Sequence, residues 1–403
     1  MLLDLFAKCR EPSLADEARE RAIYPYFHAL ESRQDTEVIM EGKRRIMLGS
    51  NNYLGLTANP AVIEAGIRAL RDYGSGCSGS RFLNGTLRMH LELEEELARF
   101  LRKEAVVTFS TGFQSNLGII SAIVGRGDYV IMDRENHASL YDGCRLSFGK
   151  MLRFRHNDMA DLEQKLCAVP DTAGCLIVTD GVFSMGGDIA NLPEICRLAK
   201  AYGARVMVDD AHGLGVIGEG GRGTASYYGL EDEVDIYMGT FSKSLASLGG
   251  YMAASERVVD YVKHSSRPFI FSASITPASC ATALTALRIL EEHPELPETL
   301  QARAVYMRQR LREARIRMRE SNGERIPIIP IYTYEAIPTL TIAKELYRRG
   351  VYVNSSLPPA TAPTECLLRT SLMATHTEAL IDEAVGILAE VLREHHVEGA
   401  QHE

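Results

Sequence analysis

The stretch Gly239-Thr240-Phe241-Ser242-Lys243-Ser244-Leu245-Ala246-Ser247-Leu248-Gly249-Gly250 places one lysine between two serines. It follows a predicted strand over residues 235–239 and ends in a pair of glycines. A lysine is most often a solvated surface residue, because lysine is almost never buried unless it is paired. The neighbours change that expectation, since Thr240 and Ser242 offer hydroxyls and the glycines let a ligand approach the backbone. The stretch therefore indicates a functional Lys243 beside a phosphate site.

A second strand end supplies an acid and a histidine. Residues 205–209 are predicted to form a strand, and the chain continues as Asp209-Asp210-Ala211-His212. A lysine, an acid and a histidine on successive strand ends are what pyridoxal 5'-phosphate (PLP) needs: a Schiff-base lysine and an acid that keeps the pyridine nitrogen protonated. Strand alternation lets only one of the two aspartates face the site, and we expect Asp209 to do so. A turn-capping role is the alternative for Asp209, and His212 is expected to reach the ring hydroxyl.

Three further strand ends carry polar residues. Residues 110–116, STGFQSN, follow a strand and open a helix, whose free N–H groups and dipole favour an anion; an ordinary capped turn is the alternative. His137 follows the strand that ends at Asp133 and is expected to stack on a flat cofactor, unless it is a structural histidine. Ser184 follows residues 175–180 and either donates to the ring hydroxyl or serves the turn.

A candidate anion clamp comes from the two ends of the chain. Arg369 lies among apolar residues on a predicted strand, and a buried arginine needs an anion. A bidentate grip on a substrate carboxylate fits this requirement, and a structural salt bridge is the alternative. Asn51 and Tyr53 precede a predicted turn at Gly55. The glycine-rich segment 74–81 lacks the spacing and the preceding strand of a nucleotide-binding loop.

Short apolar runs alternate with helical segments through most of the chain. The predicted strands are 105–109, 129–133, 151–154, 175–180, 205–209, 235–239 and 251–254, and predicted helices include 61–73, 91–102, 192–202 and 277–292. Near-continuous apolar strands between helices indicate an α/β fold with a mainly parallel seven-stranded sheet that is covered on both faces, with ligands at the carboxyl ends of the strands. A proline-bearing boundary at 293–297 precedes a basic helix at 298–320, strands at 326–334, 352–354 and 366–371, and a helix at 377–397.

These patterns predict an N-terminal arm over residues 1–58 with a hairpin near 37–48, a large PLP-binding domain over 59–292, and a smaller α+β domain over 293–403. The net charge of −9 disfavours a general nucleic-acid or anionic-membrane binder. Eight cysteines without a Cys-x-x-Cys pair suggest neither a disulfide framework nor a metal site. The N-terminus lacks a secretory pattern, so we expect a cytoplasmic protein; a peripheral membrane contact through the amphipathic N-terminal stretch stays open.

The chain resembles the α-oxoamine synthases, fold-type I PLP enzymes that condense an amino acid with an acyl thioester and release carbon dioxide. The motifs that carry the resemblance occur in the family's order over residues 22–390: NNYLGL, GSGCSGSR, TGFQSN, NHASL, DGVFSMGG, VDDAHGLG, GTFSKS and LLRTS…ATHT. Within the family, the chain is most similar to the bacterial serine palmitoyltransferase branch, on residues 24–27, residues 34–38, GTFSKSLASLGG and Leu357-Pro358-Pro359-Ala360. One departure is Ser355-Ser356, where that branch has a proline and an aliphatic residue, in a loop close to the substrate in relatives.

The resemblance implies a role for each matching position. Lys243, Asp209, His212 and His137 correspond to the catalytic set; Ser184, the backbone of Gly112 and Phe113, Thr240 and Ser242 correspond to cofactor contacts; Asn51, Tyr53 and Arg369 correspond to substrate contacts. In relatives the active site lies at a dimer interface, and a partner subunit supplies a phosphate ligand from the segment that contains Ser272 here. The resemblance therefore implies a homodimer with shared active sites.

The implied reaction is a PLP-dependent decarboxylating condensation of L-serine with a long-chain acyl thioester, either acyl-CoA or a carrier-protein thioester, to give 3-ketosphinganine in sphingolipid synthesis. The alternatives are another α-oxoamine synthase that uses alanine, glycine or a sulfonated amino acid, a non-catalytic partner subunit, and an aminotransferase. Retention of Lys243, Asp209 and His212 argues against the non-catalytic subunit, and the context of Lys243 argues against the aminotransferase.

Overall fold

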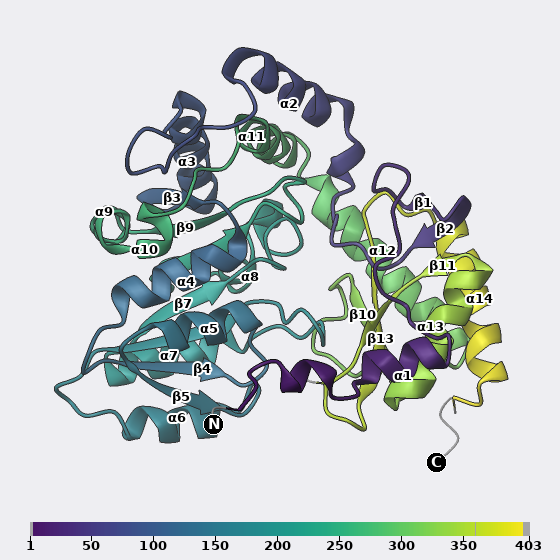
Figure 1. The fold of residues 1–403 in the computed structure, drawn as a ribbon. Helices are drawn as coiled ribbons and strands as arrows, with labels where there is room; N and C mark the ends of the chain where they lie inside the picture. The colour runs from purple at the N-terminus through teal and green to yellow at the C-terminus, as the bar shows by residue number, and fades with distance from the viewer. Residues whose placement is uncertain (1–2, 359, 398–403) are drawn as a thin grey trace.

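Seven strands form the sheet at the centre of the larger part of the protein (Figure 1). They are β3 (Ala105–Phe109), β4 (Tyr129–Asp133), β5 (Lys150–Phe154), β6 (Cys175–Asp180), β7 (Arg205–Asp209), β8 (Ile236–Thr240) and β9 (Gly250–Ala254). In this computed structural model, which describes residues 3–358 and 360–397, the strand order is β3-β9-β8-β7-β6-β4-β5, and β9 runs antiparallel to both of its neighbours. Each of the seven predicted strands is confirmed to within one residue at either end.

Successive side chains of these strands enter two different cores. Val106 and Ile131 belong to one core, whereas Val107, Val130 and Met132 belong to the other. This alternation is the pleat of a strand that is buried on both faces, and it explains the nearly continuous apolar runs in the sequence.

Helices cover each face of the sheet. The core that contains Val107 also contains side chains from α4 (Gly112–Ile123), α5 (Ala138–Leu146), α9 (Glu256–Ser265) and α10 (Arg267–Ile270). The core that contains Val106 includes side chains from α3 (Arg88–Leu101), α6 (Met159–Cys167), α7 (Leu192–Tyr202), α8 (Thr224–Tyr228) and α11 (Pro277–Glu292), and α2 (Pro60–Tyr73) packs on α11. The fold class is therefore the predicted α/β sheet flanked by helices.

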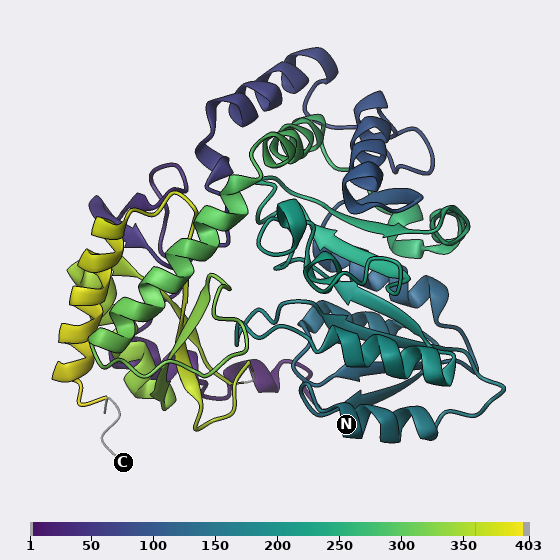
Figure 2. The ribbon, with the colours of Figure 1, turned by 180° about the vertical axis from the view of Figure 1, so that it is seen from behind.

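Two smaller sheets lie beside the large one (Figures 1 and 2). The first has the order β10-β13-β12 and the second the order β1-β2-β11. Their strands are β1 (Glu37–Met40), β2 (Lys43–Met47), β10 (Ile328–Tyr334), β11 (Val351–Tyr352), β12 (Asn354–Ser356) and β13 (Cys366–Ser371). The helices of this part are α1 (Leu14–Glu20), α12 (Glu295–Glu313), α13 (Ala336–Arg349) and α14 (Glu378–Glu394). The short 3-10 turns of the chain are η1 (Ala7–Arg10), η2 (Leu56–Ala58) and η3 (Glu219–Gly221), of which η3 lies between β7 and α8.

The N-terminal hairpin packs with the C-terminal part of the chain. β2 pairs in parallel with β11, with Ile46 opposite Val351, and Ala18 of α1 shares a small core with Leu340 of α13. The predicted domain bounds at residues 58 and 292 stay a prediction; these contacts place the arm against the smaller domain. Pro359 of the Leu357–Ala360 motif lies outside the described residues.

The predicted basic helix at 298–320 was wrong at both ends, because α12 begins at Glu295 and ends at Glu313. Pro297 lies in the first turn of α12, where its missing N–H removes no helical hydrogen bond. Beyond Glu313, Arg315 has a φ of 58° and the Ile316 N–H donates to the Leu311 carbonyl at 2.9 Å, which ends the helix. In the part of the chain that the structure describes, none of the helices has the length and apolarity needed to cross a bilayer.

Candidate active site

The predicted strand-end residues gather at one edge of the large sheet. Asp180 and Asp209 end the neighbouring strands β6 and β7, and they lie opposite each other in the strand register. Gly112 and His137 follow β3 and β4, and Lys243 follows β8. These five strands run parallel to one another, so their carboxyl ends meet at a single edge, which is where an open α/β sheet binds its ligands.

Asp209, and not Asp210, faces this edge. Asp209 Oδ1 accepts the N–H of Ala211 at 2.9 Å, and Oδ2 accepts from Asn116 of α4 at 2.6 Å. Asp210 points elsewhere and accepts from the N–H and hydroxyl of Thr224 at 2.8 and 2.6 Å. Burial raises the pKa of Asp210 to about 7, against the hydrogen bonds from Thr224. The geometry therefore agrees with Asp209 as the acid of the site; its contact with a pyridine nitrogen stays a prediction.

A chain of buried hydrogen bonds connects Asp209 to His137. Asn116 Nδ2 donates to Asp209 and also to Ser139 Oγ, at 2.8 Å. Ser139 Oγ in turn lies 2.7 Å from His137 Nδ1. Asn116 is fully buried, and its Oδ1 has no hydrogen-bond partner among the described residues. Burial lowers the pKa of His137. The negative charge of Asp209 opposes this shift, and the positive charge of Lys243 adds to it.

The surroundings of Lys243 lower the pKa of its amine. Burial lowers the pKa of Lys243 to about 8, the charge of Asp209 opposes that shift, and the charge of Arg369 adds to it. Burial and the Asp209 charge raise the pKa of Asp180 well above its ordinary value, although Asp180 Oδ2 accepts the His137 N–H at 2.9 Å. The lowered pKa increases the neutral fraction of Lys243 to about a tenth at pH 7, and the neutral form is the one that acts as a nucleophilic amine or a general base.

The start of α4 forms a cradle in which two glycines pack closely on their neighbours. A Cβ built on Gly112 would lie 2.8 Å from Thr240 Oγ1, and one on Gly250 would lie 2.7 Å from the Gly112 Cα, so neither position has room for a side chain. Thr240 Oγ1 and Ser242 Oγ lie 2.9 Å apart beside this turn. The N–H groups of the first turn of a helix have no partner within the helix, so the cradle fits a phosphate that also reaches the two hydroxyls.

Arg369 is the centre of a second polar cluster. Its Nη2 donates to Asn51 Oδ1 at 3.1 Å and to the Tyr53 hydroxyl at 3.4 Å, and its Nε donates to the Ser184 carbonyl at 2.5 Å. Tyr53 also lies 2.6 Å from His212 Nδ1. Burial, followed by the positive charges of Lys243 and Arg369, lowers the pKa of His212 well below its ordinary value. Five predicted site residues from four distant segments are thus in mutual contact.

Arg369 carries a buried charge. Its residue is 6% exposed, and among the described residues it makes no salt bridge with a carboxylate. The structure therefore gives no support to the alternative of a structural salt bridge. A buried guanidinium without a counterion is unfavourable, so Arg369 favours the binding of an anion. The cluster fits an anionic ligand group, and a planar carboxylate matches the fork of the guanidinium.

Ser272 lines a small cavity together with Ser110 and Gln114, which flank the start of α4. The neighbouring Ala273 carbonyl accepts from Ser110 Oγ, and Ser274 Oγ donates to the Gly85 carbonyl at 2.7 Å. These contacts hold the segment beside residues 79–85. Its predicted role toward a second subunit stays a prediction.

The sequence interpretation did not assign three residues that the structure places in the site. Asn116, Ser139 and Asp180 occupy motifs or strands that were identified, but no role followed from them. A signal was present for Asn116, a polar residue beside Ile119 and Ile120 on the buried face of α4, since a buried amide has to be hydrogen bonded.

Comparisons with known proteins agree with this geometry. The sequence profile of the aminotransferase class I and II family matches residues 43–388. The chain is 51% identical over 386 residues to serine palmitoyltransferase of Sphingobacterium spiritivorum, covering 96% of each chain. It is 42% identical over 380 residues to 8-amino-7-oxononanoate synthase of Geobacter sulfurreducens, covering 94% of this chain and 96% of that one. A high-resolution structure of serine palmitoyltransferase with PLP superposes with a TM-score of 0.94 at 38% identity, covering 98% of this chain and all of that one.

The residues present also fit the cofactor. The cradle at Gly112 suits a phosphate, Asp209 suits a protonated ring nitrogen, and Lys243 suits an aldehyde. The chain therefore belongs to the aminotransferase class I and II family, within the PLP-dependent α-oxoamine synthases, the group to which the serine palmitoyltransferases belong.

Proposed function

We propose that this protein condenses L-serine with a long-chain acyl thioester such as palmitoyl-CoA and releases carbon dioxide, which gives 3-ketosphinganine for sphingolipid synthesis. The observation that carries the proposal is Arg369, a buried guanidinium held by Asn51 and Tyr53 beside Lys243. An amino-acid carboxylate supplies the missing counterion. Identity of 51% to a serine palmitoyltransferase over 96% of the chain supports serine as that amino acid.

Bound PLP supplies an electron sink for the carbanion that forms at the α-carbon of the amino acid. Asp209, fixed by Asn116, holds the ring nitrogen protonated. Lys243 Nζ removes the α-proton and later returns a proton, which its lowered pKa permits near neutral pH. Arg369 would orient the carboxylate, and His137 would contact the cofactor ring. His212, kept neutral by burial, donates or accepts a hydrogen bond at the ring hydroxyl together with Ser184.

The test is product analysis by mass spectrometry with purified enzyme. L-serine, L-alanine and glycine are each offered with acyl thioesters of several lengths, in coenzyme A and carrier-protein forms. We expect 3-ketosphinganine from serine and palmitoyl-CoA, and no product from Lys243→Ala, which also loses the absorbance of covalently held PLP. Condensation of alanine or glycine in preference to serine would assign the protein to another α-oxoamine synthase activity, for which the 42% identity to 8-amino-7-oxononanoate synthase speaks. A purified protein that binds no PLP would contradict the enzymatic function altogether.

We also propose that two copies of the chain form a dimer with shared active sites. Phe82, Leu83 and Phe271 are 44%, 76% and 76% exposed. They lie on adjoining segments, since Ser274 Oγ donates to the Gly85 carbonyl. Large apolar side chains gathered on one surface are typical of an interface.

Mixed dimers test whether Ser272 acts on the partner's site. A Lys243→Ala chain is refolded together with a Ser272→Asp chain, since aspartate repels a phosphate. If Ser272 serves the other subunit, the mixed dimer contains one site with both native residues and regains activity. If Ser272 serves its own subunit, both sites carry a defect and the mixture stays as inactive as its parents.

A further inference from the structure

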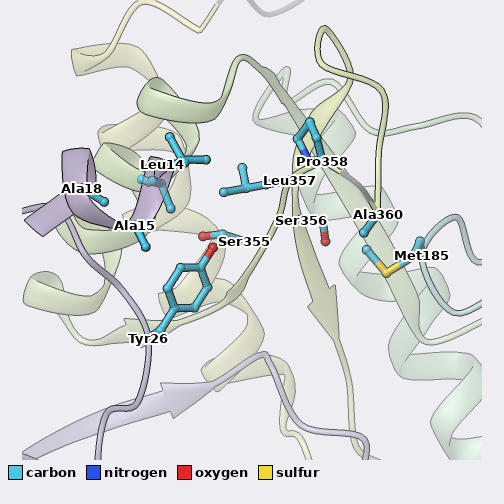
Figure 3. Close-up of a pocket in the computed structure, with 11 residues that line it drawn as sticks. Leu14, Ala15, Ala18, Tyr26, Met185, Ser355, Ser356, Leu357, Pro358 and Ala360 are labelled. Atoms are coloured by element: carbon cyan, nitrogen blue, oxygen red, sulfur yellow. The ribbon is translucent and has the colours of Figure 1, made fainter. Parts of the chain in front are cut away.

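A cavity of about 330 Å³ lies beside the Arg369 cluster, between α1, α13 and the segment that follows β12. Figure 3 shows its lining residues, with Leu14, Ala15 and Ala18 on one side and Met185 and Ala360 on the other. The volume is at the lower end of the range for small-molecule sites, about 300–1,000 Å³. None of the site residues predicted from the sequence is among the residues that line this cavity.

The inner end of the cavity adjoins the amino-acid clamp. Met185 directly follows Ser184, whose carbonyl accepts from Arg369 Nε. On the other wall, Asn354 lies opposite Arg369 in the register of β12 and β13, and Ser355 is the next residue. One step along an extended chain is about 3.3 Å, so the cavity opens within a few ångströms of the residues around the guanidinium.

The described residues that line the cavity are mainly apolar, and none of them is charged. Of the described residues around the cavity, eight are aliphatic, methionine, alanine or proline, and the other three are Tyr26, Ser355 and Ser356. Tyr26 and Ser355 point toward one another in Figure 3, and Ser355 Oγ is buried without a hydrogen-bond partner among the described residues. Such a lining favours an uncharged hydrocarbon chain over the phosphates of coenzyme A.

We propose that this cavity binds the hydrocarbon chain of the acyl thioester, with α1 as its outer wall. The proposal rests on the proposed condensation, which requires the acyl carbonyl beside the amino acid and therefore a place for the chain next to the clamp. The N-terminal helix thereby becomes a determinant of acyl-chain length. Ser355 and Ser356, the point at which this chain departs from its branch, form part of the same wall.

The first experiment measures kcat/KM across acyl-CoA substrates from octanoyl to stearoyl. Each methylene that enters the cavity raises kcat/KM about fourfold, and the rise stops once the cavity is full. Ala15→Trp fills the outer end, so its plateau should come several methylenes earlier than in the native protein, while octanoyl-CoA is used equally well. Glu20→Trp is the control, because Glu20 is exposed at the end of the same helix, and its plateau should match the native one. Coincident plateaus for all three proteins would overturn the proposal and leave the condensation intact.

The second experiment does not depend on turnover. The native chain contains no tryptophan, so Tyr26→Trp and Glu20→Trp each carry a single fluorophore. A palmitoyl-CoA analogue with a terminal bromine, added without serine, should quench the emission of the Tyr26→Trp protein saturably and leave the Glu20→Trp protein unquenched. Equal quenching of both, or of neither, would overturn the proposed site. If the native protein makes no condensation product but Tyr26→Trp is still quenched, the proposed function fails and the cavity stays an acyl-chain site.

Discussion

Asn116 donates a hydrogen bond of 2.6 Å to Asp209, across 93 residues of sequence, and both side chains are buried. Asn116 also reaches Ser139, and through it His137, so one amide positions residues expected on the edge and on the face of the cofactor. Because the amide oxygen of Asn116 has no partner among the described residues, the orientation of the side chain follows entirely from its two donated bonds.

Asn116→Ala should lower kcat by about 10- to 100-fold, which is typical when a residue that orients a functional group is removed. The pH dependence of the absorbance of bound PLP should also shift, since a loosened Asp209 stabilises the ring proton less. Ser121→Ala on the same helix is the control, because the Ser121 hydroxyl donates a hydrogen bond only to the Leu117 carbonyl of its own helix. An unchanged spectroscopic titration in Asn116→Ala would show that Asp209 needs no such support.

The lowered pKa of Lys243 predicts how quickly the apoenzyme takes up PLP. The neutral amine is the form that attacks an aldehyde, so the rate of covalent attachment should rise with pH around a midpoint near 8, not near the ordinary 10.5. Stopped-flow absorbance after mixing apoenzyme with PLP measures this midpoint. Arg369→Gln removes a charge that lowers the pKa, so its midpoint should move upward.

Arg369→Gln should also raise the KM for serine by about 10- to 100-fold, the effect of losing a charge-assisted hydrogen-bonded pair. PLP binding should persist, because Arg369 makes no hydrogen bond to Asp209, Thr240 or Ser242 among the described residues. Arg308→Gln is a matched control: Arg308 is also buried, but it donates to the carbonyls of Gly323, Ile326 and Ile328. That change should lower the thermal midpoint with no selective effect on serine. A raised serine KM in both variants would point to general loosening of the fold.

His156 should make stability depend on pH in the alkaline range. Burial favours its neutral form, but hydrogen bonds to Asp133 and Asp188 and the nearby carboxylates outweigh this and raise its pKa to about 10. A group with a raised folded pKa stabilises fully below its unfolded value of 6.5, and the stabilisation is lost as pH rises toward 10. After allowance for solvent around the partly exposed ring, the free energy of unfolding should fall by about 2 kcal/mol over this pH range.

Urea unfolding of the native protein and of His156→Asn, at pH 6 and at pH 10, measures this effect. The difference between the two proteins should be large at pH 6 and small at pH 10. His376 gives the contrast, because burial lowers its pKa to about 4 and its contribution changes only below pH 6.5. A difference for His156→Asn that is independent of pH would mean that the ring is neutral in the folded protein.

The sheet could be predicted almost residue by residue, because a strand buried on both faces must be apolar throughout. The strand predicted over 352–354 was wrong, because β11 ends at Tyr352 and β12 begins at Asn354 in a different sheet. Residues 354–356 have no strand pattern and join their sheet only by pairing with β13. The end of α12 was also missed, because residues 314–320 keep a basic, helix-favouring composition after the backbone has turned at Arg315.

The site likewise contains some residues that could be predicted from the sequence and others that could not. Residues that follow strands could be located from their motifs, because parallel strands bring their ends together. The bond between Asn116 and Ser139 depends on the packing of α4 against α5, which no local pattern encodes. The cavity is lined by residues as distant as Leu14 and Ala360, so it exists only in the folded chain.

The contact between Asn51 and Arg369 spans 318 residues. A ribosome adding about 5–20 residues per second needs tens of seconds to cover that interval. The residues expected to hold the cofactor, from Gly112 to Lys243, leave the ribosome well before Arg369 is made. The residues expected to hold the cofactor are therefore synthesised first, and the amino-acid clamp is complete only when Arg369 has been added.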